Sequence, residues 1–375
     1  MKEKVKINIK GQKKYLYSTR QITQIIDAIS EKHYKNEVLR EIVYSDDIRN
    51  VIVLDESAKV NQKYNDINED NFQIDSSNLL QIYHKGLPYS LMIDKKIMLM
   101  NTTFKIFKEL YQHSSEKNNK MSMETKKYLL FELYKILTSE EYSESSINEF
   151  LKQNSTYGDK KIKSIKNQIE RTRTLFDKYE VYNSLDSKKK EEDDKYKDVR
   201  RIEKDFFKNF YSLSKPIIYI QLEDNSWKML GVRMIKEKYF KHSNPKFVDI
   251  NKVEQNSPLI IVLAVSSPFI PVLIKLSKSL CEASKKKKNQ NKNLQEFEEI
   301  IQLTEEQYEN PDLTLQEIKK IENELIEKID ELPESLQLKV KEIKEKLTEN
   351  NISSLIENNL FIDKIDISEQ DSRNH

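Results

Sequence analysis

Glycine is scarce in this sequence: there are only four in 375 residues, and no two of them are close together. A Walker loop or a dinucleotide-binding fingerprint needs several glycines within a few residues, because the backbone must wrap closely around a phosphate. Neither motif is present. We therefore expect no nucleotide cofactor, and no other cofactor is indicated.

Cysteine and histidine are also scarce, with one and five residues respectively. Cys281 has no second cysteine for an internal disulfide, which fits a reducing cytoplasm. The five histidines are scattered and form none of the short zinc or nuclease motifs. We assign no catalytic residue and no metal site from the sequence, and we favour a non-enzymatic protein.

Long hydrophobic runs are absent as well. The longest mostly apolar stretch, residues 258–274, is seventeen residues long and contains internal prolines and serines, whereas a membrane span needs about 20 apolar residues. Leu259–Val265 is continuously apolar, which predicts a strand in the middle of a sheet. From Phe269 apolar residues recur every three or four positions, which predicts a helix capped by Ser267 with Pro268 in its first turn. A membrane span is the alternative.

The N-terminal sequence contains lysines but no apolar segment of the kind found in secretion signals. We therefore expect a cytoplasmic protein without a membrane span. Its richness in lysine, asparagine and isoleucine suggests an AT-rich bacterial genome.

Positive and negative charges are unevenly distributed along the chain. Residues 294–375 contain 22 acidic and 9 basic residues, a net charge of −13, which leaves +15 for the preceding residues. This asymmetry predicts a boundary at a basic linker, residues 284–293, and a polyanion-facing body followed by an acidic appendage.

Residues 1–100 are predicted to form a mixed α/β N-terminal part. Alternation at residues 5–9 predicts a strand, and isoleucines at residues 22–29 predict a helix. Val51–Leu54 predicts another strand. Residues 91–100 predict a hairpin, with apolar residues on both sides of Asp94 and two lysines.

Residues 101–215 contain no proline and show apolar residues at helical spacing, which predicts a helical region. Within it, Ser184–Asp198 is strongly charged and predicts a linker or an exposed helix. In residues 216–283, Ile217–Leu222 and Trp227–Ile235 flank a polar turn and predict a hairpin. We expect this hairpin to share one sheet with the strand at Leu259–Val265.

The acidic appendage, residues 294–365, is predicted to be all helical. Thr314 and Glu317 form a capping box ahead of one amphipathic helix, and Pro333 opens a second, so the two helices can pair as an antiparallel hairpin. Residues 366–375 are predicted to be disordered. The predicted fold class is α+β: a mixed-sheet body with a long helical middle region, plus the C-terminal acidic all-helical appendage.

Basic residues are concentrated in two places: within Lys228–Lys246, where Tyr239 and Phe240 lie among them, and within the predicted helix Lys160–Lys178. Cations can contact phosphates, and neighbouring aromatic rings can stack on unpaired bases. A solvated face is the simpler explanation in a chain with 64 lysines and arginines. The candidate nucleic-acid-binding residues are Arg171, Arg173, Arg233, Lys236, Lys238, Tyr239, Phe240 and Lys241.

We therefore expect a non-enzymatic interaction protein whose basic face contacts nucleic acid or a protein partner. The acidic helices would bind a protein partner or cover the basic face. The alternative is a metal-dependent nuclease or other hydrolase, which needs carboxylates that converge at strand ends. The candidate carboxylates for such an enzyme are Asp55, Asp94, Glu223 and Asp224. Each also lies where an ordinary turn favours an acidic residue.

The segment from Asp66 to Ser77 partly resembles a calcium-binding loop in its spacing of oxygen ligands. Asp66, Asn68 and Asp70 occupy the first, third and fifth positions of such a loop. The sixth position is Asn71 instead of glycine, and the twelfth is Ser77 instead of the bidentate glutamate. A solvated acidic loop is therefore the favoured interpretation.

Overall fold

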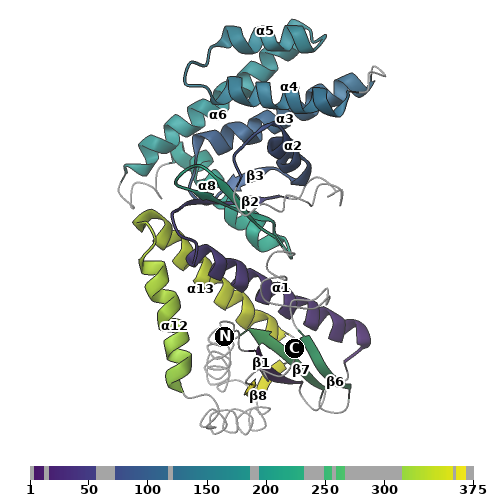
Figure 1. The fold of residues 1–375 in the computed structure, drawn as a ribbon, viewed down its shortest axis with the longest axis vertical. Helices are drawn as coiled ribbons and strands as arrows, with labels where there is room; N and C mark the ends of the chain where they lie inside the picture. The colour runs from purple at the N-terminus through teal and green to yellow at the C-terminus, as the bar shows by residue number, and fades with distance from the viewer. Residues whose placement is uncertain are drawn as a thin grey trace, which may run out of the picture. The chain divides into compact units, whose positions relative to one another are not determined.

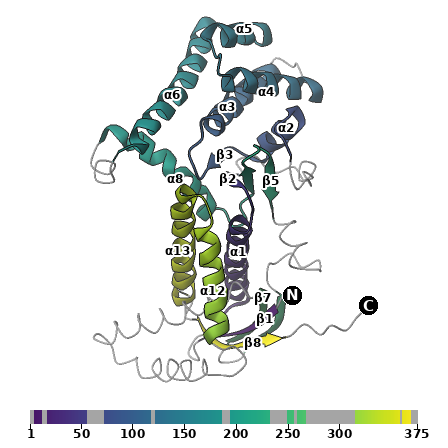
Figure 2. The same ribbon diagram turned by 60° about the vertical axis from the view of Figure 1, so that its left-hand side comes forward.

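The chain forms two compact units (Figures 1 and 2). In this computed structural model, unit 1 comprises residues 1–45 and 232–375, and unit 2 comprises residues 46–231. The structure describes residues 4–11, 17–55, 72–116, 121–185, 194–231, 249–255, 259–266, 315–357 and 360–368. Unit 2 is therefore one continuous segment, inserted between the two parts of the sequence that build unit 1.

Both units combine helices with an antiparallel sheet, so the α+β class is confirmed. The sheet of unit 1 has the strand order β6-β7-β1-β8, and the sheet of unit 2 has the order β3-β2-β4-β5. Every strand pairing in the two sheets is antiparallel.

The sheet of unit 1 joins the two ends of the described chain. Val5 lies opposite Val265 of one neighbouring strand and opposite Ile367 of the other. The strand predicted at Leu259–Val265 is confirmed, and it excludes one continuous membrane helix over residues 258–274. The four strands are β1 (Lys4–Gly11), β6 (Asp249–Gln255), β7 (Leu259–Ser266) and β8 (Leu360–Ser368).

Helix α1 (Thr19–Val43) confirms the helix predicted after the first strand. It begins with a capping box, in which the Ser18 hydroxyl accepts from the Gln21 backbone N–H and the Gln21 side chain accepts from the Ser18 N–H. This arrangement satisfies donors that the first turn of a helix leaves unpaired. The isoleucine stripe of residues 22–29 is buried.

Helices α12 (Leu315–Asp330) and α13 (Glu334–Glu357) confirm the two predicted C-terminal helices. They contact each other, and both also contact α1. Val340 and Ile343 of α13 are fully buried. The acidic helices are therefore part of unit 1 and share its core with the N-terminal helix.

This organisation differs from the predicted domains. We predicted a body at residues 1–283 and a separate appendage at residues 294–365, with internal limits at residues 100 and 215 that both fall inside unit 2. The predicted appendage also ends in strand β8 instead of helix. The alternation of Ile365 and Ile367 with Asp366 is typical of a strand. The strand that pairs with β8 is β1, which lies at the other end of the sequence.

In unit 2 the hairpin predicted around Asp224–Ser226 is confirmed. Asn225 occupies the turn with φ of 63°, in the left-handed region that asparagine tolerates better than most residues. The hairpin does not share a sheet with β7, because β4 pairs with β2 instead. The four strands are β2 (Ile48–Leu54), β3 (Pro88–Ser90), β4 (Ile218–Leu222) and β5 (Trp227–Leu230).

The helical region predicted for residues 101–215 is confirmed where it is described. Helix α3 contacts α4 and α6, and α8 contacts β2 and β3, so the helices pack on one another and on the small sheet. A single 3-10 turn, Asp194–Tyr196, precedes α8. The helices of unit 2 are α2 (Ser76–Lys85), α3 (Lys95–Glu116), α4 (Met123–Thr138), α5 (Glu144–Asn154), α6 (Asp159–Asn183) and α8 (Lys197–Ser212).

The hairpin predicted for residues 91–100 is wrong, because helix α3 begins at Lys95. The Asp94 carboxylate accepts a hydrogen bond from the Ile97 backbone N–H at 3.0 Å, as a helix-capping side chain does. Ile97 and Met100 are both buried and continue into a longer apolar stripe of α3. The same apolar residues that suggested a strand are therefore the first turns of a helix.

Several sequence predictions fall on residues that the structure does not describe. They are the helix from Phe269, the basic linker at residues 284–293, the acidic loop from Asp66 to Asn71 and most of the predicted disordered tail. Within the described ranges, no helix is both long and apolar enough to cross a membrane.

The division into units changes the meaning of the charge asymmetry. Residues 46–231 contain 32 basic and 31 acidic residues, and the remaining 32 basic and 31 acidic residues belong to unit 1. Each unit therefore has a net charge of +1. The acidic segment from residue 294 onward belongs to the same unit as the most basic segments of the sequence.

Candidate anion-binding pocket

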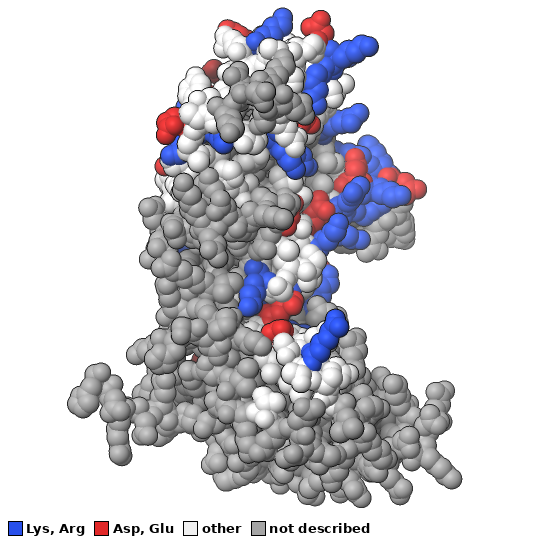
Figure 3. All heavy atoms as spheres, turned by 90° about the vertical axis from the view of Figure 1, so that its right-hand side faces the viewer, with Lys and Arg blue, Asp and Glu red and all other residues white. Residues whose placement is uncertain are grey.

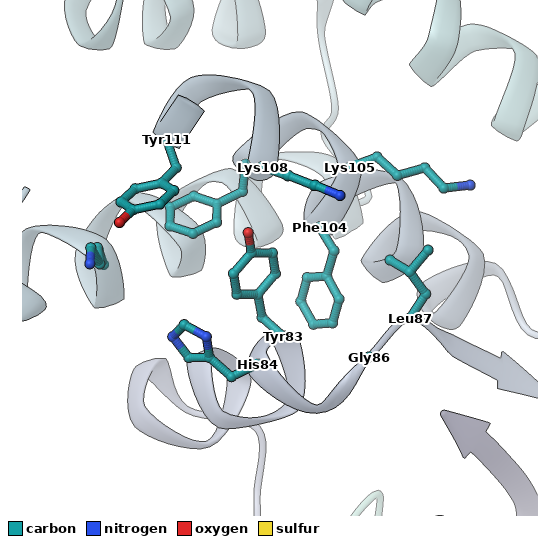
Figure 4. Close-up of a pocket in the computed structure, with 10 residues that line it drawn as sticks. Tyr83, His84, Gly86, Leu87, Phe104, Lys105, Lys108 and Tyr111 are labelled. Atoms are coloured by element: carbon teal, nitrogen blue, oxygen red, sulfur yellow. The ribbon is translucent and has the colours of Figure 1, made fainter. Parts of the chain in front are cut away.

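A pocket of about 340 Å³ lies in unit 2, between the end of α2, the middle of α3 and the start of α4 (Figure 4). We call it the lysine pocket because three lysines line it: Lys105, Lys108 and Lys126. None of its lining residues is an aspartate or a glutamate.

Helix α2 ends in a way that opens this pocket. Its buried side carries Leu79, Leu80 and Ile82, so Tyr83 and His84 are left to line the pocket. The helix ends at Gly86, whose φ of 150° lies in a region that side-chain-bearing residues rarely adopt. The glycine therefore lets the chain leave the helix sharply.

The floor of the pocket is aromatic. The Tyr83 ring meets Phe104 at 5.5 Å and Phe107 at 5.0 Å between centroids, both nearly perpendicular. Such edge-to-face pairs are favourable because the positive edge of one ring meets the negative face of another. The two phenylalanines are buried, while Tyr83 is half-buried, so the tyrosine is the ring that a ligand can reach.

The cations are arranged around this floor. Lys105 and Lys108 are exposed, and in Figure 4 the Lys108 side chain extends toward the Phe104 side of the pocket. The Lys126 ammonium lies 4.6 Å from the centroid of the Tyr111 ring, in a cation–π contact that holds it at the pocket. The ammonium groups of Lys108 and Lys126 therefore lie at a small volume, Lys105 lies at its edge, and the described lining residues include no carboxylate.

Burial sets the charge state of the other polar groups. Desolvation, followed by the positive charge of Lys126, lowers the pKa of His84 below its ordinary value, so the imidazole is neutral at pH 7. Burial raises the pKa of Tyr83, and the nearby Tyr111 raises it further to a smaller extent. The Tyr83 hydroxyl therefore keeps its proton and can donate it in a hydrogen bond. The pocket can therefore offer ammonium groups and a neutral hydroxyl to an anion.

Positive charge continues from the pocket to α8. Desolvation raises the pKa of the half-buried Asp205 carboxyl, while the nearby charges of Arg201, Lys208 and Lys105 oppose that rise. Positions 201, 205 and 208 lie on one side of a helix because of their spacing. Three cations thus lie near one carboxylate; we call Lys105, Arg201 and Lys208 the α8 strip.

Figure 3 shows that lysine and arginine side chains are more numerous than acidic ones over the upper part of one face. Because the net charge of unit 2 is close to zero, a binding surface must arise from such local groupings and not from the total charge.

The predicted nucleic-acid-binding residues are only partly described. Arg171 is exposed on α6. Arg173 is used inside the fold: its Nη2 donates to the Leu137 carbonyl at 2.6 Å, and its guanidinium lies 3.8 Å from the Tyr142 ring centroid. The other six lie outside the described residues, and they are Arg233, Lys236, Lys238, Tyr239, Phe240 and Lys241.

The residues of the lysine pocket were not predicted. In the sequence, Phe104, Phe107 and Tyr111 indicated only the buried side of a helix. Lys105 and Lys108 follow two of these rings directly, and this interleaving of cations with aromatic residues was the available signal. Their partners on α2 and α4 are brought in only by the packing of three helices.

The carboxylates considered for metal-dependent hydrolysis have turn and capping roles. Asp55 accepts from the Leu87 backbone N–H at 2.8 Å, and Asp224 accepts from the Ser226 N–H at 2.8 Å. Asp94 caps α3, and Glu223 is exposed. Within the described ranges, no three His, Cys, Asp or Glu side chains are grouped as a metal site would need.

The residues at the end of the segment that was compared with a calcium loop are described and cap a helix. Asp75 accepts hydrogen bonds from the backbone N–H groups of Ser77 and Asn78, at 2.8 and 2.7 Å, and so caps α2. Ser77 is thus already inside a helix instead of closing a calcium loop.

No protein-family model matches this chain, and neither the curated proteins nor the solved structures include a match to it.

Proposed function

We propose that this is a cytoplasmic, non-enzymatic interaction protein, of bacterial origin, in which unit 2 binds single-stranded nucleic acid. The observation that supports this function most is the lysine pocket: three lysines beside the half-buried rings of Tyr83 and Tyr111, with no lining carboxylate. Ammonium groups attract phosphates, and aromatic rings stack on bases.

The shape of the site favours a single strand over a duplex. Bases in a duplex are stacked on their neighbours, and a side chain in a pocket cannot reach their faces. An unpaired base can be turned outward and placed against an aromatic ring. A site that combines a concave aromatic floor with cations at its rim is therefore suited to an unpaired nucleotide.

The α8 strip extends the proposed contact beyond the pocket. Arg201 and Lys208 are exposed and, like Lys105, lie near Asp205, so the phosphates that follow the bound nucleotide can be neutralised there. Counting the pocket and the strip together, the cations that we expect to contact phosphates are Lys105, Lys108, Lys126, Arg201 and Lys208.

The salt dependence of binding tests this proposal. For single strands, log K against log salt concentration falls with a slope of about −0.7 per neutralised phosphate, so five contacts give about −3.5. We expect a slope near this value for a labelled single strand measured by fluorescence anisotropy. Changing Lys108, Arg201 and Lys208 to alanine removes three contacts and should reduce the slope to about −1.4.

The matched control changes three exposed lysines on α3 and α5, Lys95, Lys96 and Lys152, to alanine. This control removes the same total charge and should keep most of the slope. An equal loss of slope in both triple variants would contradict a localised site. Absence of salt-dependent binding in the unmodified protein would contradict the function.

For the acidic helices we propose partner binding or covering of the basic segments in their own unit. Glu324, Glu327 and Glu334 are exposed on α12 and α13, and the acidic and basic segments share unit 1. If the helices cover basic segments, changing these three glutamates to glutamine should increase affinity for the same strand at low salt. Unchanged affinity would contradict covering and leave partner binding as the proposal.

A further inference from the structure

We infer that the lysine pocket receives the terminal nucleotide of a single strand and binds the phosphate monoester at its end. This inference depends on the proposed function and makes it more specific, because it assigns one chemical group to the pocket and the internal phosphates to the α8 strip.

The size of the pocket supports a single nucleotide. Its volume of about 340 Å³ is close to the lower end of the range for ligand pockets, about 300–1,000 Å³. Such a volume suits one compact ligand and not several successive nucleotides. A strand that binds here is therefore expected to place one nucleotide in the pocket and continue outside it.

The charge of the pocket supports a monoester. An internal phosphodiester carries one negative charge, whereas a terminal phosphate monoester carries about −1.5 to −2 near pH 7. The ammonium groups of Lys108 and Lys126 line the pocket, Lys105 lies at its exit, and none of the described lining residues is a carboxylate. The more highly charged end group therefore matches these cations better than an internal phosphate does.

The placement of the side chains gives the bound nucleotide an orientation. Lys126 lies against the Tyr111 ring on one side of the Tyr83 hydroxyl, and in Figure 4 the Lys108 nitrogen lies on the other side, above Phe104, so the phosphate belongs between these two lysines. Tyr83 is a protonated donor beside that position. Lys105 points away from Tyr83 in Figure 4, toward the side where Leu87 lies, and interacts with Asp205. The strand would therefore leave the pocket on the Lys105 side.

Three oligonucleotides of identical sequence with an internal fluorescent label test the inference. One has hydroxyl groups at both ends, one has a 5′-phosphate and one has a 3′-phosphate. We expect one of the phosphorylated forms to bind the full-length protein about tenfold more tightly than the hydroxyl form, as for hydrogen bonds to a charged group. The Lys108→Ala variant should lose this difference, and Lys152→Ala should keep it.

The outcomes separate the inference from the function on which it depends. Equal affinity for all three oligonucleotides, with the salt slope retained, overturns the terminal-phosphate site but not nucleic-acid binding. Absence of binding by all three overturns both. A phosphate preference that persists unchanged in Lys108→Ala and in Lys126→Ala places the end group elsewhere and also overturns the inference. Circular dichroism of each variant confirms that it remains folded.

Discussion

Changing Val340 to aspartate is expected to unfold unit 1 while unit 2 remains folded. Val340 is fully buried on α13, and this helix contacts both α1 and strand β8. A carboxylate at this position would be buried among apolar side chains without a cation or a hydrogen-bond donor to pair with it. Such changes are among the most destabilising single substitutions. We expect the free energy of unfolding of unit 1 to fall by about 4 kcal/mol or more.

The sequence provides both a control and a selective probe. Leu338 lies on the same helix and is 70% exposed, so Leu338→Asp should change the stability by about 0.5 kcal/mol at most. The single tryptophan, Trp227, is buried in unit 2 and reports the unfolding of that unit by fluorescence. In Val340→Asp, part of the helical circular dichroism should be lost while the Trp227 transition persists. Equal effects of the two variants would contradict the proposed core of unit 1.

Changing Phe206 to alanine is expected to have the complementary effect. Phe206 is fully buried on α8, stacks with Phe210 at 5.8 Å and meets Phe207 edge-to-face at 5.7 Å. Removing the ring leaves a cavity that the neighbouring side chains fill only partly. The expected loss in the free energy of unfolding of unit 2 is about 3–5 kcal/mol.

Denaturant unfolding followed by Trp227 fluorescence measures this loss directly. Lys204→Ala, an exposed position in the same helix, is the control and should leave the transition midpoint almost unchanged. A Phe206→Ala variant that kept the original midpoint would mean that α8 does not contribute to the core reported by Trp227.

The packing of α13 and β8 in unit 1 limits how the role of the acidic helices can be tested. Because α13 packs on α1 and β8 pairs with β1, deleting the C-terminal segment would remove part of the core of unit 1. A change in nucleic-acid affinity after such a deletion would combine unfolding with lost charge. The substitution of exposed glutamates by glutamine is therefore the better test of covering.

Much of the local structure could be predicted from the sequence. The capped helix after Ser18, the hairpin around Asn225 and the strand at Leu259–Val265 each depend on residues close together in the chain. Turn chemistry, capping and hydrophobic period decide such elements locally. The hairpin predicted at residues 91–100 failed because a short apolar run suits both a strand and the start of a helix, and the Asp94 cap decides between them.

The arrangement of the units could not be predicted in the same way. No local pattern indicates that β1 pairs with β8, since the two strands lie at opposite ends of the sequence. The charge asymmetry suggested a boundary, but charge does not determine which segments share a core. The lysine pocket was missed for a similar reason, because its residues come from three helices and each looks ordinary within its own helix.

The central place of β1 in its sheet has a consequence for protein synthesis. Its two neighbouring strands are made long after it, and β8 follows about 350 positions later. At 5–20 residues per second, a ribosome needs roughly 20 to 70 seconds to reach that point. Meanwhile the inserted segment, residues 46–231, is complete and can fold. Strand β1 therefore has neither neighbour until β7 has been made, and one of its edges stays unpaired until β8 follows. A chaperone that shields extended segments would favour correct assembly during this period.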